Sequence, residues 1–270
     1  MRFPLRIARR FKFSVVDPAE ALAKRTVAVA KDYEIRPLTM VDFPHLMDLG
    51  EGFVKDDSLM RAVAATFLLF RRSLELVFTQ AIASQEIVNT SLIVTHKASG
   101  KPVGYRLYYP VWRDELRGCP YAMRGHAAEQ AKHKLNEHEK CANAMQNLFY
   151  DKFWEMHPMR KVTFRGDTVH VSSAHRGNGI FHVLYEYDLR FDDISKKTGA
   201  KYFTGIATAQ KVKDLNLSSM KPVFTGPTTI RTVDGTEVPL PAGAISLMAR
   251  EMEGAFACDV KPHWEKMELI

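Results

Sequence analysis

The chain has 270 residues, of which 46% are hydrophobic, so it can bury a substantial core as one large domain or as one domain with extensions. Its net charge of +7 comes from scattered lysines and arginines rather than from a basic stripe with interleaved aromatics, and no nucleic-acid partner is expected. No apolar run approaches the roughly 20 residues that span a bilayer, so no membrane segment is expected either.

The three cysteines, Cys119, Cys141 and Cys258, are few and odd in number, and they lack the spacing of a metal site. Free thiols are typical of a reducing compartment. We therefore expect a cytoplasmic protein without a bound metal.

The first 14 residues are basic, with five lysines and arginines and no acidic residue. A mitochondrial transit segment and a basic arm, loose or packed on the domain, both explain this composition, so mitochondria are the alternative compartment. We expect residues 1–31 to form an N-terminal extension that is helical from about Pro18 to Ala30.

The first half of the domain predicts a strand, two helices and a hairpin. The elements expected are a strand at 33–37, a helix at 41–49 that Gly50 and Gly52 end, a helix at 58–83, and a hairpin with strands at 91–96 and 103–109. Residues 58–83 repeat apolar side chains at helical spacing. Those expected to point inward are Leu59, Val63, Phe67, Phe70, Leu74 and Phe78.

The second half alternates helices and strands. The elements expected are a long helix at 126–156, a strand at 168–171, a helix at about 180–197, a strand at 201–207, a short helix at 210–219, a small hairpin at 232–238 and a late strand at 244–249. Asp234-Gly235 supplies the turn of the small hairpin.

A glycine-containing turn, Arg176-Gly177-Asn178-Gly179, joins the strand that ends at Val171 to the helix that follows. Successive backbone N–H groups in such a turn point at one spot, and the helix N-terminus adds the positive end of its dipole. Glycines let the chain approach a ligand without a Cβ in the way. The segment therefore predicts an anion-binding site.

The stretch from Val171 to Phe181 resembles the acetyl-CoA signature of the GNAT superfamily of N-acetyltransferases. The family pattern is Gln or Arg, two residues, Gly, one residue, then Gly or Ala, preceded by a strand that ends in an apolar residue five positions earlier. Arg176 opens the pattern, Gly179 is its fourth position and Val171 is the strand residue. Phe181 departs from it, and its side chain is expected either to narrow the pyrophosphate pocket or to turn into the core.

The resemblance extends from about Tyr33 to Glu251 and implies an α/β (α+β) fold. We expect a GNAT-like domain at 32–256, with a mixed, mostly antiparallel central sheet flanked by helices. A long helical insert at about 126–157, before the signature strand, is similar to inserts in arylalkylamine-type members. Residues 257–270 are then a C-terminal tail.

The resemblance also implies acetyl-CoA as the cosubstrate and a set of residues that contact it. Backbone groups of the signature strand would meet the pantetheine arm and the acetyl carbonyl, and the glycine turn would surround the pyrophosphate. The set is Val169, His170, Val171, Arg176, Gly177, Asn178, Gly179, Ile180 and Phe181.

Two carboxylates are candidates for the general base. Residues 52–59 resemble a segment of insect arylalkylamine acetyltransferases, in which Asp57 falls at a catalytic glutamate; the shorter aspartate is expected to act through a water. Capping of the next helix by Asp57 explains the same pattern equally well. Asp167 is the second candidate, because two-residue alternation places it on the face of Val169 and Val171.

His170 is expected on the opposite face of that strand, as a structural histidine with satisfied hydrogen bonds rather than as a base. Many family members protonate the leaving thiolate with a tyrosine on the helix after the next strand. Residues 210–220 hold no tyrosine, so Ser218, Ser219 or water would serve instead.

The interpretation that these features favour is an acetyl-CoA-dependent N-acetyltransferase that acts on a small-molecule amine, of arylalkylamine or polyamine type, by direct attack in a ternary complex. The alternatives are a catalytically weak acyl-CoA-binding module of the same fold and a protein-directed N-acetyltransferase. A nucleic-acid-binding protein is the least favoured. The sequence does not separate a monomer from a homodimer.

Overall fold

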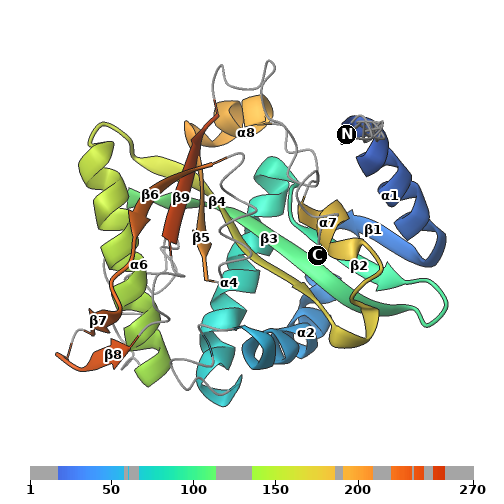
Figure 1. The fold of residues 1–270 in the computed structure, drawn as a ribbon, viewed down its shortest axis with the longest axis horizontal. Helices are drawn as coiled ribbons and strands as arrows, with labels where there is room; N and C mark the ends of the chain where they lie inside the picture. Colours follow the sequence, from blue (N-terminus) through green and yellow to red (C-terminus); the bar gives the residue numbers. More distant parts are fainter. Residues whose placement is uncertain are drawn as a thin grey trace, which may run out of the picture.

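The chain is built around one seven-stranded sheet (Figure 1). A computed structural model describes residues 18–57, 60, 67–113, 136–185, 191–208, 220–232, 234–239 and 246–252. Within these residues the strand order is β1-β2-β3-β4-β5-β9-β6, and β7 and β8 form a separate two-stranded ribbon. The strands are β1 (Tyr33–Pro37), β2 (Leu92–His96), β3 (Lys101–Trp112), β4 (Val162–Val171), β5 (Tyr202–Ala207), β6 (Lys221–Thr225), β7 (Thr229–Arg231), β8 (Glu237–Pro239) and β9 (Ser246–Glu251).

The sheet is mixed, because β4 and β5 are parallel while every other neighbouring pair is antiparallel. The predicted fold class, a mostly antiparallel sheet flanked by helices, is therefore confirmed. The single parallel pair lies in the middle of the strand order, and it becomes the centre of the candidate site.

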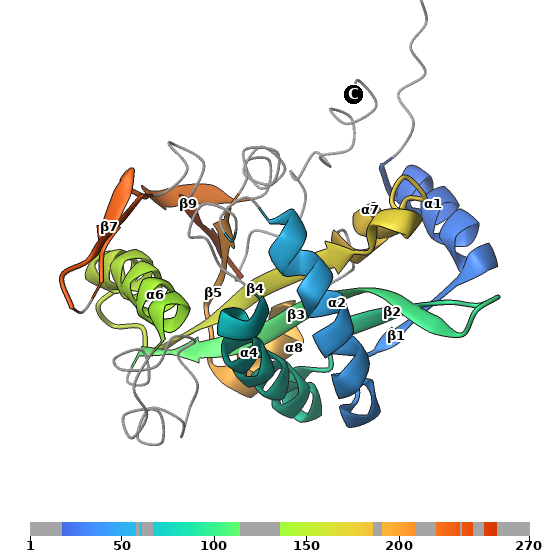
Figure 2. The same cartoon turned by 90° about the horizontal axis from the view of Figure 1, so that it is seen from below.

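Helices pack against the sheet on both faces (Figures 1 and 2). They are α1 (Pro18–Asp32), α2 (Phe43–Asp56), α4 (Phe67–Val88), α6 (Glu137–Met156), α7 (Ile180–Tyr185) and α8 (Phe191–Thr198), with short 3-10 turns at Met40–Asp42 and Ser173–His175. Helices α2, α4 and α6 share the largest hydrophobic cluster with β3, whereas α1 and α7 form another with β2 and the end of β4. None of these described helices is long and apolar enough to cross a membrane.

Most predicted elements are present in the described residues, often with longer strands than expected. The strand at 33–37 and the end of the long helix at Met156 have the predicted bounds, and β3 and β4 extend beyond the predicted 103–109 and 168–171. Leu74 and Phe78 are buried as predicted. The structure does not describe the side chains of Leu59, Val63, Phe67 and Phe70, the helix predicted at 210–219, or residues 126–135 and 186–190 of two other predicted helices.

The prediction that Gly50 and Gly52 end a helix is wrong, because α2 continues through both of them to Asp56. A Cβ on Gly50 would lie 1.9 Å from Leu74 Cδ2 on α4, and a Cβ on Gly52 would lie 3.0 Å from His170 Nε2 on β4. Both glycines therefore mark places where α2 packs closely on its neighbours.

Helix α1, which lies in the predicted N-terminal extension, packs against α7 and β1; Figure 1 shows it next to β1. Val29 is 2% exposed and belongs to the same cluster as Ile180 and Val183 of α7. Lys97 Nζ, at the end of β2, donates to the carbonyl oxygen of Ala30 at 2.5 Å. The helix was predicted, and its packing on α7 places it beside the glycine turn.

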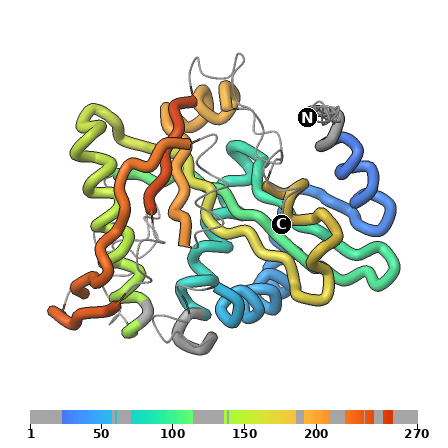
Figure 3. The backbone as a smooth tube through the Cα atoms, in the orientation of Figure 1, coloured from blue at the N-terminus to red at the C-terminus, as the bar shows by residue number. Residues whose placement is uncertain are grey.

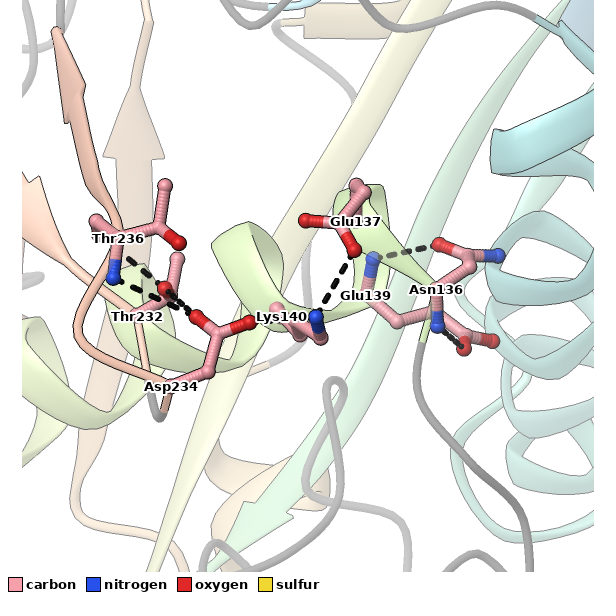
Figure 4. Close-up of polar contacts among 7 residues, drawn as sticks. All are labelled: Asn136, Glu137, Glu139, Lys140, Thr232, Asp234 and Thr236. Carbon is pink, nitrogen blue, oxygen red and sulfur yellow. Dashed lines mark hydrogen bonds and ion pairs between the residues drawn. The ribbon is translucent and has the colours of Figure 1, made fainter.

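The prediction of a continuous helix over 126–156 is wrong at Asn136, because a capping box there starts α6 at Glu137 (Figure 4). The start of α6 is also tied to the small hairpin. Asn136 Oδ1 accepts from the Glu139 N–H and Glu139 Oε2 accepts from the Asn136 N–H, each at 2.9 Å. Lys140 Nζ pairs with Asp234 Oδ2 at 2.5 Å, in the turn between β7 and β8. This bond, with one from Thr232, holds the pKa of Asp234 below its usual range. The predicted hairpin is confirmed, and it is held against α6.

Candidate functional site

Strands β4 and β5 pair over a short stretch and then diverge (Figure 3). Their parallel ladder ends where Gly166 opposes Gly205. Beyond that point β4 stays paired with β3 as far as Val171, and β5 stays paired with β9 as far as Ala207. Each strand therefore presents backbone N–H and C=O groups, unused by a strand partner, to the gap between them.

Strand β4 has one extra residue relative to β3 just beyond the end of that ladder. Arg106 and Tyr108 are two residues apart on β3, whereas their partners Val169 and Gly166 on β4 are three apart. Such a β-bulge interrupts the alternation of side chains and releases a backbone group from the ladder. The bulge falls at residues 167–168, at the mouth of the gap.

The bulge overturns the prediction that Asp167 shares the face of the valines that end β4. Asp167 Oδ1 lies 2.5 Å from a guanidinium nitrogen of Arg165, whose Cζ lies over the ring of Tyr109. His170 packs against Tyr105, which lies in the same hydrophobic cluster as Tyr109 on the α2, α4 and α6 side. Asp167 and His170 therefore lie on one face, because a single inserted residue reverses the phase of the alternation.

A cavity of about 40 Å³ opens at the bulge. Its lining includes Gly166, Thr168 and Val169 of β4, together with Arg106 of β3 and Tyr185 of α7. A volume of this size holds roughly two or three water molecules or the end of a small ligand. The cavity therefore offers a small pocket on the α7 side of the point where the two strands separate.

The glycine turn is held in one conformation by side chains around it. Gly177 and Gly179 have φ angles of +83° and +79°, in the left-handed region that favours glycine. Asn178 Nδ2 donates to Tyr33 Oη at 3.0 Å, and Tyr33 Oη lies 3.1 Å from His175 Nδ1. A Cβ on Gly177 would meet no atom within 4 Å, so open space adjoins the turn.

Arg176 opens the turn and connects it to α2. Its Nε donates to the carbonyl oxygen of Val171 at 3.0 Å, and its guanidinium pairs with the carboxylate of Asp56. Because the two side chains are 47% and 39% exposed, this ion pair adds little stability. An anionic ligand in the turn is therefore able to compete for the guanidinium.

Phe181 turns toward the core, which is one of the two alternatives stated for it above. Its ring packs on the cluster that contains Ile180 and stacks on Tyr185, with 5.6 Å between the ring centroids. The departure from the family pattern thus extends the packing of α7.

Asp57 follows α2 and bonds to two other segments. Its Oδ1 accepts from the Met60 N–H at 3.0 Å, which is the predicted capping bond. Its Oδ2 accepts from the hydroxyl of Thr208, immediately after β5, at 2.9 Å. The carboxylate lies on the β5 side of the gap.

The hydroxyl of Tyr105 lies within electrostatic range of both candidate carboxylates. Its side chain is fully buried, and its hydroxyl has no hydrogen-bond partner among the residues that the structure describes. Burial raises the pKa of this hydroxyl well above its usual value, and the charges of Asp167 and Asp57 raise it further. Both carboxylates therefore lie near enough to one hydroxyl to act on its ionisation.

His170 is buried beneath α2, next to this group. Burial, with the nearby charge of Arg176, lowers its pKa to about 4, so the ring is neutral at neutral pH. The ring packs edge-on against Phe53, with 6.2 Å between the centroids. Its nitrogens bond to no described residue, which differs from the satisfied structural histidine that the sequence predicts.

No protein-family model matches the sequence, and no curated protein sequence matches it. Solved structures do match. A mosquito arylalkylamine N-acetyltransferase like 5b aligns with a TM-score of 0.63 and 12% identity over 81% of this chain and 99% of that chain. A variant of agmatine N-acetyltransferase in its apo form aligns with a TM-score of 0.58 and 12% identity, over 81% and 97%. Drosophila melanogaster polyamine N-acetyltransferase aligns with a TM-score of 0.53 and 13% identity, over 81% and 98%.

The chain has the GNAT fold. In this GNAT fold the predicted cofactor residues fall into two groups, and both adjoin the opening between β4 and β5. One group is the end of β4, at 169–171, and the other is the glycine turn and first turn of α7, at 176–181. Asp57 and Asp167 lie on the far side of the sheet from α7, near Tyr105.

Two charged side chains of the site, Arg106 and Arg165, were not identified from the sequence. Arg106 lies inside β3, whose other residues are mostly apolar or aromatic, and a charge inside such a strand is the signal that marks it. Among the described residues, no group of three or more histidine, cysteine, aspartate or glutamate side chains is placed to hold a metal ion.

Proposed function

We propose that the chain is an N-acetyltransferase that moves an acetyl group from acetyl-CoA to a small-molecule amine of arylalkylamine or polyamine type. The observation that carries the proposal is the divergence of β4 from β5, with the glycine turn at one end and Asp57 across the opening. Fold neighbours that are arylalkylamine, agmatine and polyamine N-acetyltransferases support this chemistry. The proposal includes a cytoplasmic location and a monomer or homodimer.

The residues around the opening suit the donor. The free edge of β4 offers alternating N–H and C=O groups, which match the amides of a pantetheine arm. The turn with Gly177 and Gly179 brings backbone N–H groups to an open surface, as a pyrophosphate requires, and Arg176 adds a positive charge. When bound, the donor supplies a thioester, which is an acyl group activated toward attack by an amine.

The bulge in β4 suits stabilisation of negative charge on the reacting carbonyl oxygen. Its extra residue, at 167–168, takes a backbone N–H out of the ladder at the point where the donor's carbonyl would lie. A backbone N–H that the sheet fixes in place before the reaction stabilises such a transition state by about 3 kcal/mol in comparable sites.

Asp57 is the carboxylate that we assign as the base. It accepts the proton of the amine, directly or through a water, and its bonds to Thr208 and Met60 fix its position. Asp167 is already paired with Arg165 in a site where both side chains are less than 10% exposed. A proton on Asp167 would leave that buried guanidinium without its counter-charge, so Asp167 is the weaker candidate.

Calorimetric titration with acetyl-CoA tests the donor site. Gly179→Val adds a branched side chain at a φ of +79° and brings a Cβ to 3.5 Å from Val29 of α1, so we expect acetyl-CoA affinity to fall more than tenfold. Gly235→Val is the matched control, because Gly235 has a φ of +86° in the β7–β8 turn, remote from the opening. Equal affinity in wild type and Gly179→Val would refute the donor site.

Release of free thiol from acetyl-CoA, measured with a panel of amines, then tests the reaction. Release with one amine class supports the proposal and names the acceptor. Binding without release on any small amine would favour the catalytically weak module, or the protein-directed enzyme if peptides are acetylated instead.

A further inference from the structure

Arg106 carries a buried charge that forms no ion pair within the part of the chain that the structure describes. The residue is 7% exposed, and the only other arginine buried to this degree among the described residues, Arg165, is paired with Asp167. No described carboxylate forms an ion pair with Arg106. A buried charge is costly unless it is paired, so an arginine in this position suits a ligand with an anionic group.

The hydrogen bonds of Arg106 also leave donors available. A guanidinium has five N–H donors, and one described acceptor, the carbonyl oxygen of Leu184, bonds to Arg106, at 3.2 Å. Its Cζ lies 4.8 Å from the ring centroid of Tyr108 and 4.4 Å from that of Tyr185. These contacts and the bond to the end of α7 hold the group in place, but none of them supplies a negative charge.

Arg106 lines the cavity at the bulge, together with Thr168 and Val169. Asp167 also lines this cavity, but its carboxylate is already engaged by Arg165 on the other face of the sheet. In the proposed function, the acyl end of the donor lies against this part of β4. The pocket that receives the acyl group is therefore positively charged at its wall.

We infer that the preferred donor is a thioester whose acyl group ends in a carboxylate, such as a short dicarboxylic acyl-CoA, with Arg106 binding that carboxylate. This inference rests on the proposed function and narrows its donor. An acetyl group would leave the guanidinium facing a methyl, whereas a carboxylate offers a charge-assisted, two-point bond to the planar group. The 40 Å³ cavity suits one carboxylate at the end of a short chain.

The transfer itself is unchanged by the distal carboxylate. The amine nitrogen attacks the thioester carbonyl carbon, the C–N bond forms and the C–S bond breaks. The amine loses one proton to Asp57, the thiolate leaves with the electron pair of the C–S bond, and that proton returns to the thiolate. The product is an amide that keeps its terminal carboxylate.

Calorimetry with succinyl-CoA and acetyl-CoA tests the inference. We expect the wild-type protein to bind succinyl-CoA at least tenfold more tightly than acetyl-CoA. Arg106→Met should reduce this preference by about ten- to hundredfold, which is the effect of one charged hydrogen-bonded pair. Arg160→Met is the matched control, because Arg160 also lies over a tyrosine ring, that of Tyr202, but does not line the cavity; the preference should stay as in wild type.

The wild-type measurement alone can refute the inference, so it does not depend on Arg106→Met being folded. Equal or tighter binding of acetyl-CoA would overturn the inference and leave the proposed function standing. Binding of neither donor would overturn both.

A carboxylate on the acceptor is the other source of the same chemistry. Thiol release from acetyl-CoA with phenylalanine and with phenethylamine separates the two sources. If Arg106→Met selectively lowers the rate with phenylalanine, Arg106 binds the acceptor and the donor assignment is wrong. If it does not, the assignment to the donor is supported.

Discussion

Asp167→Asn tests whether Asp167 acts mainly as the counter-charge of Arg165. The substitution keeps the size of the side chain but removes its negative charge, and Arg165, at 7% side-chain exposure, is left with an uncompensated positive charge. Breaking a buried pair on one side costs about 3–5 kcal/mol. The cavity beside Asp167 admits water, which reduces this cost, so we expect a loss of about 3 kcal/mol.

The assay is urea unfolding at pH 7, followed by tryptophan fluorescence and circular dichroism. In a thermal melt, the same loss of 3 kcal/mol corresponds to a fall in melting temperature of about 6–12 °C for a domain of this size. Glu237→Gln is the control, because it removes one charge from the Arg231–Glu237 pair, whose side chains are 71% and 62% exposed. That change should leave the free energy of unfolding within error.

Two results would contradict this reasoning. The first is an Asp167→Asn protein that is as stable as wild type. The second is an Arg165→Met, Asp167→Leu double variant that is less stable than Asp167→Asn alone, since removal of both charges should recover part of the loss. A stable Asp167→Asn protein with a large loss of turnover would instead assign Asp167 as the base.

Two further predictions concern the packing of α2. Gly50→Ala should lower the free energy of unfolding by about 1 kcal/mol, because overpacking against Leu74 outweighs the gain of about 1 kcal/mol in helix propensity. In a chain that also carries Leu74→Ala, Gly50→Ala should be neutral or favourable. Additive losses in the double variant would refute the contact between Gly50 and Leu74. The pKa of His170 is lowered to about 4 in the folded state, so the unfolded chain takes up its proton first as the pH falls below about 6.5, and stability is lost between about pH 6.5 and 4. The loss from this group is at most about 3 kcal/mol, and urea unfolding across this pH range should show a smaller slope in His170→Gln; identical slopes would contradict it.

Local chemistry was enough to predict the glycine turn and the elements around it. The need for positive φ at Gly177 and Gly179 follows from the residue type, and the strand before them ends at Val171 as predicted. Hydrophobic periodicity likewise predicts Leu74 and Phe78 in the core. These features depend on neighbours in the chain, so the sequence carries them directly.

The same local reasoning failed where a distant segment decides the outcome. Gly50 and Gly52 read as helix breakers, but close packing against α4 and β4 stabilises the helix through them. The predicted face of Asp167 on β4 was wrong, because the bulge depends on how β4 pairs with β3. Strand pairing depends on tertiary structure.

The sequence by itself therefore determined the order of most elements but not strand β6, the glycine turn that we propose as the anion site, and the two candidate carboxylates. Only the tertiary structure decided which groups meet: Asp57 with Thr208, Asp167 with Arg165, and Arg106 with the cavity. The physical reason is that burial and pairing set the energy of a charge, and both depend on residues that are far apart in the chain.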